Sequence, residues 1–229
     1  MKVRLIKSFN FEAAHHHPGE GQPIHGHHFE VHIFQSGDID PSLGWLVDFG
    51  EIKAAVKPVL DQLDHRFLND IPGLGQGTRE ELEAWIHERI RQRLPFAAGV
   101  RVRTREQRGF DLVRLPEDPL LDLPERYAFR FEAAHSLPLT PPDHKCHRLH
   151  GHSYRIELAM RKAPPPRKVC EEIYRLLDFN CLNQIEGLHN PTAENLAVWM
   201  WDRLTLNRVD LKVVIVAETC ESSCVFSGR

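Results

Sequence analysis

Two short motifs with the residue types of a metal site each occur twice in the chain. Phe-Glu-Ala-Ala-His ends at His15 and again at His135, and a His-Gly-His follows at 25–27 and at 150–152. Side chains two positions apart on a β-strand point to the same side, so each His-Gly-His presents two imidazoles together. The earlier histidine completes a set of three nitrogen ligands. Three protein ligands with an open fourth position are typical of a catalytic zinc ion.

A single His-x-His is more often a surface or core pair than a pair of ligands. Its repetition behind the same partner motif favours metal binding in both halves. The predicted ligands are His135, His150 and His152 in the second half, and His15, His25 and His27 in the first. In the first half, His16, His17 and His28 lie beside the candidates and leave the assignment open, so that site could also be a structural relic.

The duplication extends beyond the histidines. Asp178 follows Asp64, and Trp199 follows Trp85, by the same number of positions, so no insertion separates these anchors in either copy. A repeat of this length predicts two similar structural units in place of one large domain. We expect the units to span residues 1–115 and 124–229.

The pattern of apolar residues predicts the elements that position the histidines. Period-two alternation at 27–34 and at 152–158 predicts a strand around each His-Gly-His. Helical spacing predicts two helices in each unit, at 51–63, 79–94, 169–177 and 193–204. The polar, proline-bearing stretch at 114–119 is the expected boundary between the units.

Composition excludes several classes of protein. With 29 basic and 32 acidic residues and a net charge of -3, the chain has no nucleic-acid footprint. No apolar run approaches the roughly 18 residues of a membrane span, and no signal peptide opens the sequence. The five cysteines all lie in the second half and form no even disulfide framework. We therefore expect a cytoplasmic protein with free thiols, no nucleic-acid partner and no membrane partner.

The ordered motifs resemble those of the 6-pyruvoyl-tetrahydropterin synthase family. Besides the histidine motifs, the resemblance rests on Lys145-Cys146-His147, Asn190-Pro191-Thr192 and Ala217-Glu218-Thr219. The three residues between Cys146 and His150 resemble the bacterial 6-carboxytetrahydropterin synthase branch. The resemblance implies an α+β fold of two tandem tunnelling-fold (T-fold) units. Each unit would be a four-stranded antiparallel sheet with two helices on one face, and units would assemble into a barrel with pterin sites at their interfaces.

The resemblance also implies roles for residues of the second half. The three histidines would bind Zn²⁺, Cys146 would act as the base and Glu218 would anchor the pterin ring. Thr192 would lie near the pterin, although capping of the following helix explains this residue equally well. An Asp-His pair that assists proton transfer in the family is incomplete here, because Phe179 follows Asp178.

The first half has the opposite losses. Its Asp64-His65 pair is intact, but Gly21 stands where the cysteine would be and Thr104 roughly where the glutamate would be. In the family, one active site takes its cysteine and its Asp-His pair from adjacent subunits. The complementary losses therefore predict a composite site made by both halves, within one chain or between chains. The alternative is independent decay, which would leave a pterin-binding or assembly protein without catalysis.

The predicted activity follows from the resemblance. We expect a zinc-dependent lyase that converts 7,8-dihydroneopterin triphosphate to 6-carboxy-5,6,7,8-tetrahydropterin, acetaldehyde and triphosphate, in the queuosine and deazapurine pathway. A 6-pyruvoyl-tetrahydropterin-forming enzyme or a pterin side-chain aldolase is the catalytic alternative. The expected partners are a small-molecule pterin and further copies of the chain, with a trimer of two-domain chains favoured.

Overall fold

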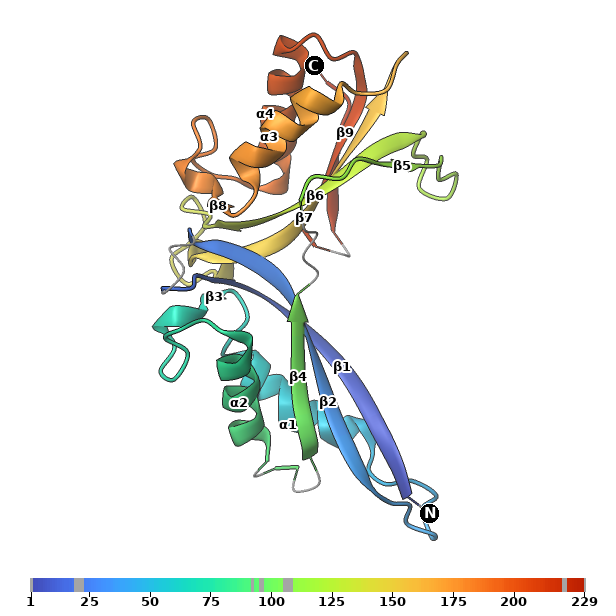
Figure 1. Cartoon of the computed structure of the whole chain (residues 1–229), viewed down its shortest axis with the longest axis vertical. Coiled ribbons are helices and arrows are strands. Elements are labelled where there is room, and N and C mark those ends of the chain that lie inside the picture. The colour runs from blue at the N-terminus through green and yellow to red at the C-terminus, as the bar shows by residue number, and fades with distance from the viewer. Residues whose placement is uncertain are drawn as a thin grey trace.

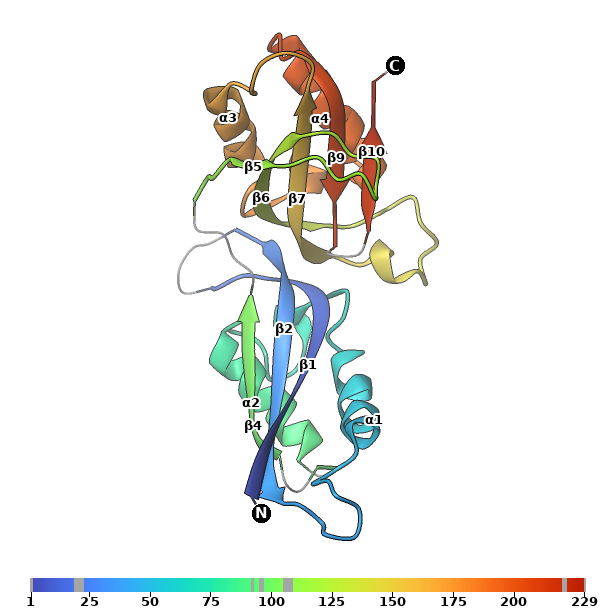
Figure 2. The same cartoon turned by 90° about the vertical axis from the view of Figure 1, so that its right-hand side faces the viewer.

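The chain folds into two β-sheets, each accompanied by two helices. The computed structural model describes residues 2–18, 23–91, 93–94, 97–104, 109–219 and 222–228. Figure 1 shows the two sheets placed end to end, with one pair of helices beside each. The second view in Figure 2 shows that α1 and α2 accompany the first sheet and that α3 and α4 accompany the second.

The first sheet has the strand order β3-β1-β2-β4. Its strands are β1 (Lys2–His15), β2 (His25–Asp38), β3 (Arg66–Phe67) and β4 (Ala97–Thr104). The long strands pair antiparallel, whereas the two-residue β3 runs parallel to β1. The helices of this half are α1 (Phe49–Leu60) and α2 (Arg79–Ile90).

Local signals set where these two helices begin. The side chain of Asp48 accepts a hydrogen bond from the Gly50 amide, and that of Thr78 accepts one from the Glu81 amide. Such caps satisfy amides that have no partner inside the helix. Apolar side chains of both helices are fully buried against the sheet, as Ile52 and others in the first core are.

The second sheet has the order β10-β9-β7-β6-β5, and a two-residue β8 also pairs with β6. Its strands are β5 (Val113–Leu115), β6 (Arg126–His135), β7 (His150–Met160), β8 (Asn180–Cys181), β9 (Leu211–Ala217) and β10 (Ser223–Phe226). The helices are α3 (Arg167–Leu177) and α4 (Ala193–Leu206). The repeat predicted from sequence is visible in the shared pattern of two long antiparallel strands, two helices and a further strand.

The α+β class with antiparallel sheets and four helices is confirmed. One strand lies elsewhere than expected: Val113–Leu115 pairs with β6 in the second sheet, and Phe110 packs against the second core. The segment before the expected boundary thus leaves the first sheet, which keeps three long strands and the short β3. Neither sheet closes into a barrel within the described part of one chain, so a barrel built from several chains remains a prediction.

The two halves meet at the strand ends that carry the histidine motifs. Strands β1 and β2 contact β6 and β7 there. Their backbones come close at Gly26 and Gly151, both buried, where a Cβ placed on Gly26 would lie 2.2 Å from the Gly151 Cα. The glycine inside each His-Gly-His therefore lets the two backbones touch, which brings the two sets of histidines close together.

Replacing Gly26 with alanine is expected to destabilise the docking of the halves. The added methyl group has no space against the Gly151 backbone, and overpacking of this kind costs about 1–3 kcal/mol. The free energy of unfolding from urea titration should fall by this amount. Gly99→Ala is the matched control on strand β4, because a Cβ there meets nothing within 4 Å. A G26A chain as stable as the control would show that this contact does not hold the halves together.

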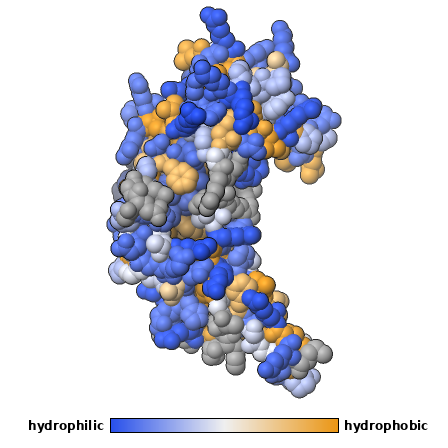
Figure 3. Space-filling view, in the orientation of Figure 1, coloured by the Kyte–Doolittle hydropathy of each residue, from blue (hydrophilic) through white to orange (hydrophobic). Residues whose placement is uncertain are grey.

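The surface carries hydrophobic residues in scattered patches. On the face shown in Figure 3 these patches lie between hydrophilic regions. Exposed leucines such as Leu120, Leu139 and Leu206 come from different parts of the chain. Among the described residues, no helix combines the length and the apolar character needed to span a bilayer.

Candidate metal and catalytic site

The turn after α1 places His65 at the interface between the halves. His65 has a left-handed backbone (φ 55), and its amide donates to the Glu12 carbonyl over 2.6 Å. Asp64 accepts a hydrogen bond from the Glu12 amide over 3.1 Å. The second half repeats this turn: Phe179 has φ 53 and donates to the Glu132 carbonyl, and Asp178 accepts from the Glu132 amide over 2.9 Å. The aspartate therefore fixes the turn in both halves, whether or not a histidine follows it.

The histidines of the second half form a compact buried cluster. His135 ends β6 directly opposite His150, and His152 lies two residues further along β7. One nitrogen from each ring lies within 4.8 Å of the others. All three side chains are at most 2% exposed. We call this cluster the second trio.

The hydrogen bonds of the second trio leave its inner nitrogens suited to a metal. Nδ1 of His135 lies 3.0 Å from the Pro191 carbonyl, and Nδ1 of His150 lies 2.7 Å from the Arg148 carbonyl. A carbonyl oxygen only accepts, so each Nδ1 carries the proton and each Nε2 presents a lone pair. The two Nε2 atoms lie 3.1 Å apart. Burial lowers the pKa of both imidazoles, so a proton does not readily fill the gap. The two Nε2 lone pairs repel each other at this distance, and a cation between them removes that repulsion. Three imidazoles fit a zinc-like ion.

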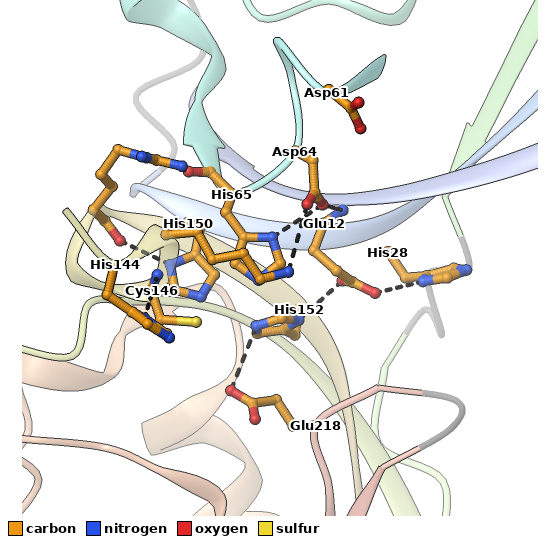
Figure 4. A network of polar contacts seen from close by, with 12 residues as sticks. Glu12, His28, Asp61, Asp64, His65, His144, Cys146, His150, His152 and Glu218 are labelled. Atoms are coloured by element: carbon orange, nitrogen blue, oxygen red, sulfur yellow. Dashed lines mark hydrogen bonds and ion pairs between the residues drawn. The ribbon is translucent and has the colours of Figure 1, made fainter. Parts of the chain in front are cut away.

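The residues that the sequence divided between the halves meet at this trio within one chain (Figure 4). The His65 ring stacks on the His150 ring with centroids 4.5 Å apart, and its Nδ1 lies 2.9 Å from the Asp64 carboxylate. Cys146, on the short turn Lys145–His147, has its sulfur within 4.8 Å of nitrogens of His65 and His150. A thiol, an Asp-His pair and a metal-binding trio thus share one small volume.

Charge around the Asp-His pair favours an ionised carboxylate. Burial alone would raise the pKa of Asp64, but His65, the Glu12 amide and Lys145 together lower it to about 2. Lys145 Nζ lies 3.6 Å from this carboxylate, and Arg148 donates from its guanidinium to the His65 carbonyl over 3.2 Å. Both basic residues come from the second half, so the pair is held from both sides of the interface.

Glu218 lies directly against the second trio. Its Oε1 is 3.2 Å from Nε2 of His135 and 3.4 Å from Nε2 of His152. Burial would raise the pKa of this carboxyl, but the imidazoles of His135 and His152 beside it lower that pKa. Thr192 has a different place: its hydroxyl caps α4 by accepting from the Asn195 amide over 3.2 Å. Among the described residues, no hydrogen bond joins Thr192 to the trio.

The first half holds a trio of the same design. Nδ1 of His15 lies 2.8 Å from the Gly77 carbonyl, and Nδ1 of His25 lies 2.8 Å from the Pro23 carbonyl. The His15, His25 and His27 nitrogens lie within 4.8 Å of one another. The His15 Nε2 is buried without a hydrogen-bond partner in the described structure, and burial with the neighbouring imidazoles lowers the pKa of His15 to about 2. The first trio therefore also fits a metal ion.

The surroundings of the first trio lack the proton-transfer groups. Phe179 lies over His25 at 4.4 Å, where His65 lies over His150 in the other half. Thr104, at the end of β4, lines a cavity of about 630 Å³ together with His15 and His17. Gly21, expected at the cysteine position, lies outside the described residues.

The structure also separates the extra histidines of the first half from its trio. His16 stacks on Phe67 at 5.7 Å, and His28 Nδ1 lies 2.6 Å from the Glu12 carboxylate. The His17 ring lies beside that of His15 at 4.8 Å. Only His17 therefore remains next to the three candidate ligands.

Comparison with known proteins identifies the family. The family model described as 6-pyruvoyl tetrahydropterin synthase matches residues 4–113 and again residues 126–229. The chain belongs to the 6-pyruvoyl tetrahydropterin synthase family. The two matches cover both halves, so the resemblance drawn from the repeated motifs is confirmed.

Individual members of the 6-pyruvoyl tetrahydropterin synthase family match about half of the chain. A dihydroneopterin monophosphate aldolase of Pyrococcus furiosus is 40% identical over 96 residues, which are 42% of this chain and 81% of the relative. A 6-carboxy-5,6,7,8-tetrahydropterin synthase of Synechocystis is 35% identical over 96 residues, 38% of this chain and 74% of the relative. The structure of the Caenorhabditis elegans 6-pyruvoyl tetrahydropterin synthase is 20% identical, covers 47% of this chain and 96% of its own, and has a TM-score of 0.40.

Sequence reasoning about this family member missed the two glutamates of the repeated motif. These are Glu12 on β1 and Glu132 on β6. The structure buries them to 7% and 1% exposure, and each contacts a histidine of the opposite half. The repeated Glu three residues before the first ligand was the available signal, but it could not show which half the side chain reaches.

Proposed function

We propose that the chain is a zinc-dependent lyase acting on 7,8-dihydroneopterin triphosphate, with one composite active site per chain. One water would be consumed, and the products would be 6-carboxy-5,6,7,8-tetrahydropterin, acetaldehyde and triphosphate. The observation that carries the proposal is the convergence of Cys146 and Asp64-His65, from opposite halves, on the second trio. The family assignment and the relative named 6-carboxy-5,6,7,8-tetrahydropterin synthase support the same substrate class.

The second trio would hold the metal through Nε2 of His135, His150 and His152. Zn²⁺ bound there would polarise the side-chain oxygens of the pterin. Independent decay explains the complementary losses less well, since it does not require the retained cysteine and the retained Asp-His pair to meet. Their meeting within one chain is what a composite catalytic site needs.

The chain's own residues would bind the pterin and move protons. Cys146 would take a proton from the pterin side chain as a thiolate. His65 would exchange a proton with the neighbouring side-chain oxygen, while Asp64 keeps the imidazole oriented and stabilises its charged form. Glu218 would accept paired N–H groups from the 2-amino-pyrimidinone edge of the ring, and an unpaired carboxylate there would select against other rings. For Thr192, capping remains the better supported role.

Products distinguish this reaction from its alternatives. Zinc-loaded protein incubated with 7,8-dihydroneopterin triphosphate is expected to release acetaldehyde, triphosphate and a carboxylated pterin in equal amounts. Chromatography measures the carboxylated pterin, and derivatisation measures the acetaldehyde. Transformation to a pyruvoyl pterin without acetaldehyde would move the chain to the pyruvoyl-forming class. A pterin recovered unchanged would favour a binding or assembly protein.

An aldolase is the second candidate, because the Pyrococcus furiosus relative with 40% identity is named a dihydroneopterin monophosphate aldolase. Cleavage between the first and second side-chain carbons would leave a hydroxymethyl pterin and a two-carbon aldehyde that keeps its phosphate. The lyase reaction instead gives an aldehyde without phosphate. The presence of phosphate on the released aldehyde therefore decides between the two activities.

The first trio would serve as a second, structural metal site. It has the same carbonyl-bound Nδ1 atoms as the second trio, but Phe179 covers it in place of a proton-carrying histidine. We also propose that the protein is cytoplasmic and that chains associate further, with a trimer of two-domain chains as the favoured assembly. Each chain would then supply one active site from two units.

A further inference from the structure

Two buried glutamates occupy equivalent places at the interface between the halves. Glu12 lies on β1 of the first half and Glu132 on β6 of the second, each three residues before the first histidine of its trio. Their side chains are 9% and 1% exposed. A buried carboxylate is costly unless it is paired, so the partners of these two groups are informative.

Each glutamate contacts the last histidine of the opposite trio. Glu12 Oε2 lies 3.0 Å from Nδ1 of His152, and Glu132 Oε2 lies 2.9 Å from Nδ1 of His27. Each glutamate also contacts a residue of its own half: Glu12 Oε1 lies 2.6 Å from His28 Nδ1, and Ser153 donates its hydroxyl to Glu132 over 2.6 Å. Figure 4 shows Glu12 between His28 and His152.

The other two histidines of each trio are held differently. Their Nδ1 atoms bond to backbone carbonyls of their own half, at Pro191 and Arg148 in the second trio and at Gly77 and Pro23 in the first. Among the hydrogen bonds and ion pairs of the described residues, only the last histidine, His152 or His27, takes its Nδ1 partner from the other half. The direction of its Nε2 lone pair therefore depends on a carboxylate that the other half provides.

A carboxylate on Nδ1 of a metal-binding histidine fixes the tautomer and the ring orientation and makes the ligand more basic. We propose that Glu12 and Glu132 are exchanged positioning residues, each completing the metal site of the half to which it does not belong. The inference rests on the proposed function to the extent that both trios bind metal. It also links the sites to the interface: a trio binds metal tightly only while the halves are docked, and by reciprocity metal binding stabilises the docking.

The test uses two full-length backgrounds that each retain one trio. His15→Ala removes a ligand of the first trio and leaves the second, whereas His150→Ala does the reverse. The dissociation constant for Zn²⁺ is measured in each by competition with a chromophoric chelator. Loss of such an outer contact typically weakens metal binding 10–100-fold.

The expected pattern crosses between the halves. In the H15A background, Glu12→Gln should weaken Zn²⁺ binding by about 10–100-fold and Glu132→Gln should leave it within a factor of about two. In the H150A background, the effects of the two substitutions should exchange. A general loss of structure would weaken both trios in both backgrounds, so the crossed pattern separates positioning from folding.

Glu30→Gln is the matched control. Glu30 is also a buried glutamate on a central strand, but its carboxylate pairs with Arg103. It should leave both dissociation constants unchanged. Should E12Q or E132Q fail to fold, Glu12→Asp and Glu132→Asp keep the charge but withdraw the carboxylate by one methylene, and the same crossed loss is expected.

Three results would overturn the inference. The exchange is wrong if substitution of each glutamate weakens Zn²⁺ binding only at the trio of its own half, or changes it in neither background. Either result leaves the proposed enzyme intact. No Zn²⁺ binding in either background would remove the inference together with the metal of the proposed function. Product formation by the unsubstituted protein, measured separately, tells these failures apart.

Discussion

Replacing His65 with phenylalanine is expected to lower kcat by about 10²–10⁴-fold without loss of the metal, because the substitution removes a proton-transfer group and little else. Position 179 shows that a phenyl group fits this turn. Phe179 has φ 53 against φ 55 for His65, and it lies 4.4 Å from His25 as His65 lies 4.5 Å from His150. Turnover under substrate saturation, together with metal per chain from elemental analysis, measures the effect.

Phe179→His is the reciprocal control for this prediction. It places a histidine next to Asp178 over the first trio. The sequence of the first half has Gly21 at the position that aligns with the cysteine. The variant should leave turnover unchanged and should not restore activity to H65F. Full turnover in H65F would remove the Asp-His pair from the chemistry and, with it, the composite site.

Much of the site was predictable because its residues lie on regular strands. The alternation of a strand places His150 and His152 on one side, and the register of β6 with β7 brings His135 opposite them. The repeat also showed that the first half lacks a counterpart of Cys146 and that the second half lacks a counterpart of His65. Position in the repeat was enough, since both halves share one local fold and the residues keep their places in it.

Contacts across the interface were not predictable in the same way. Alternation and register place Glu12 on the same face of the sheet as His28 of the neighbouring strand β2, but they do not show that the other half covers that face. The short strand Val113–Leu115 has little pattern of its own, and it pairs with β6 directly after Phe110 and Leu112, which pack against the second core. The position of Glu218 against the trio depends on where β9 ends, which the motif alone does not fix.

Replacing Cys146 with alanine is expected to lower kcat by about 10²–10⁴-fold while leaving KM for the pterin and the bound metal nearly unchanged. The thiol lies beside His65 and His150 but is not one of the three histidines of the second trio. Burial and the Glu218 carboxylate hold the pKa of Cys146 above its usual value, and Lys145 and Arg148 offset this rise only in part. A base in this position must be a thiolate. The metal held at His150 and the charged side chains of Lys145 and Arg148 are therefore needed to form it.

Cys181→Ala is the matched control for this substitution. Cys181, like Cys146, is a half-buried thiol of the C-terminal unit, and its sulfur lies 3.8 Å from the Asn183 side chain. Loss of this thiol should leave kcat unchanged. If C146A instead raised KM with kcat preserved, the thiol would contribute to binding alone and the base would have to be sought among the remaining groups, with His65 the nearest. A loss of kcat confined to C146A and H65F, residues from opposite halves, would place both on the same reacting pterin.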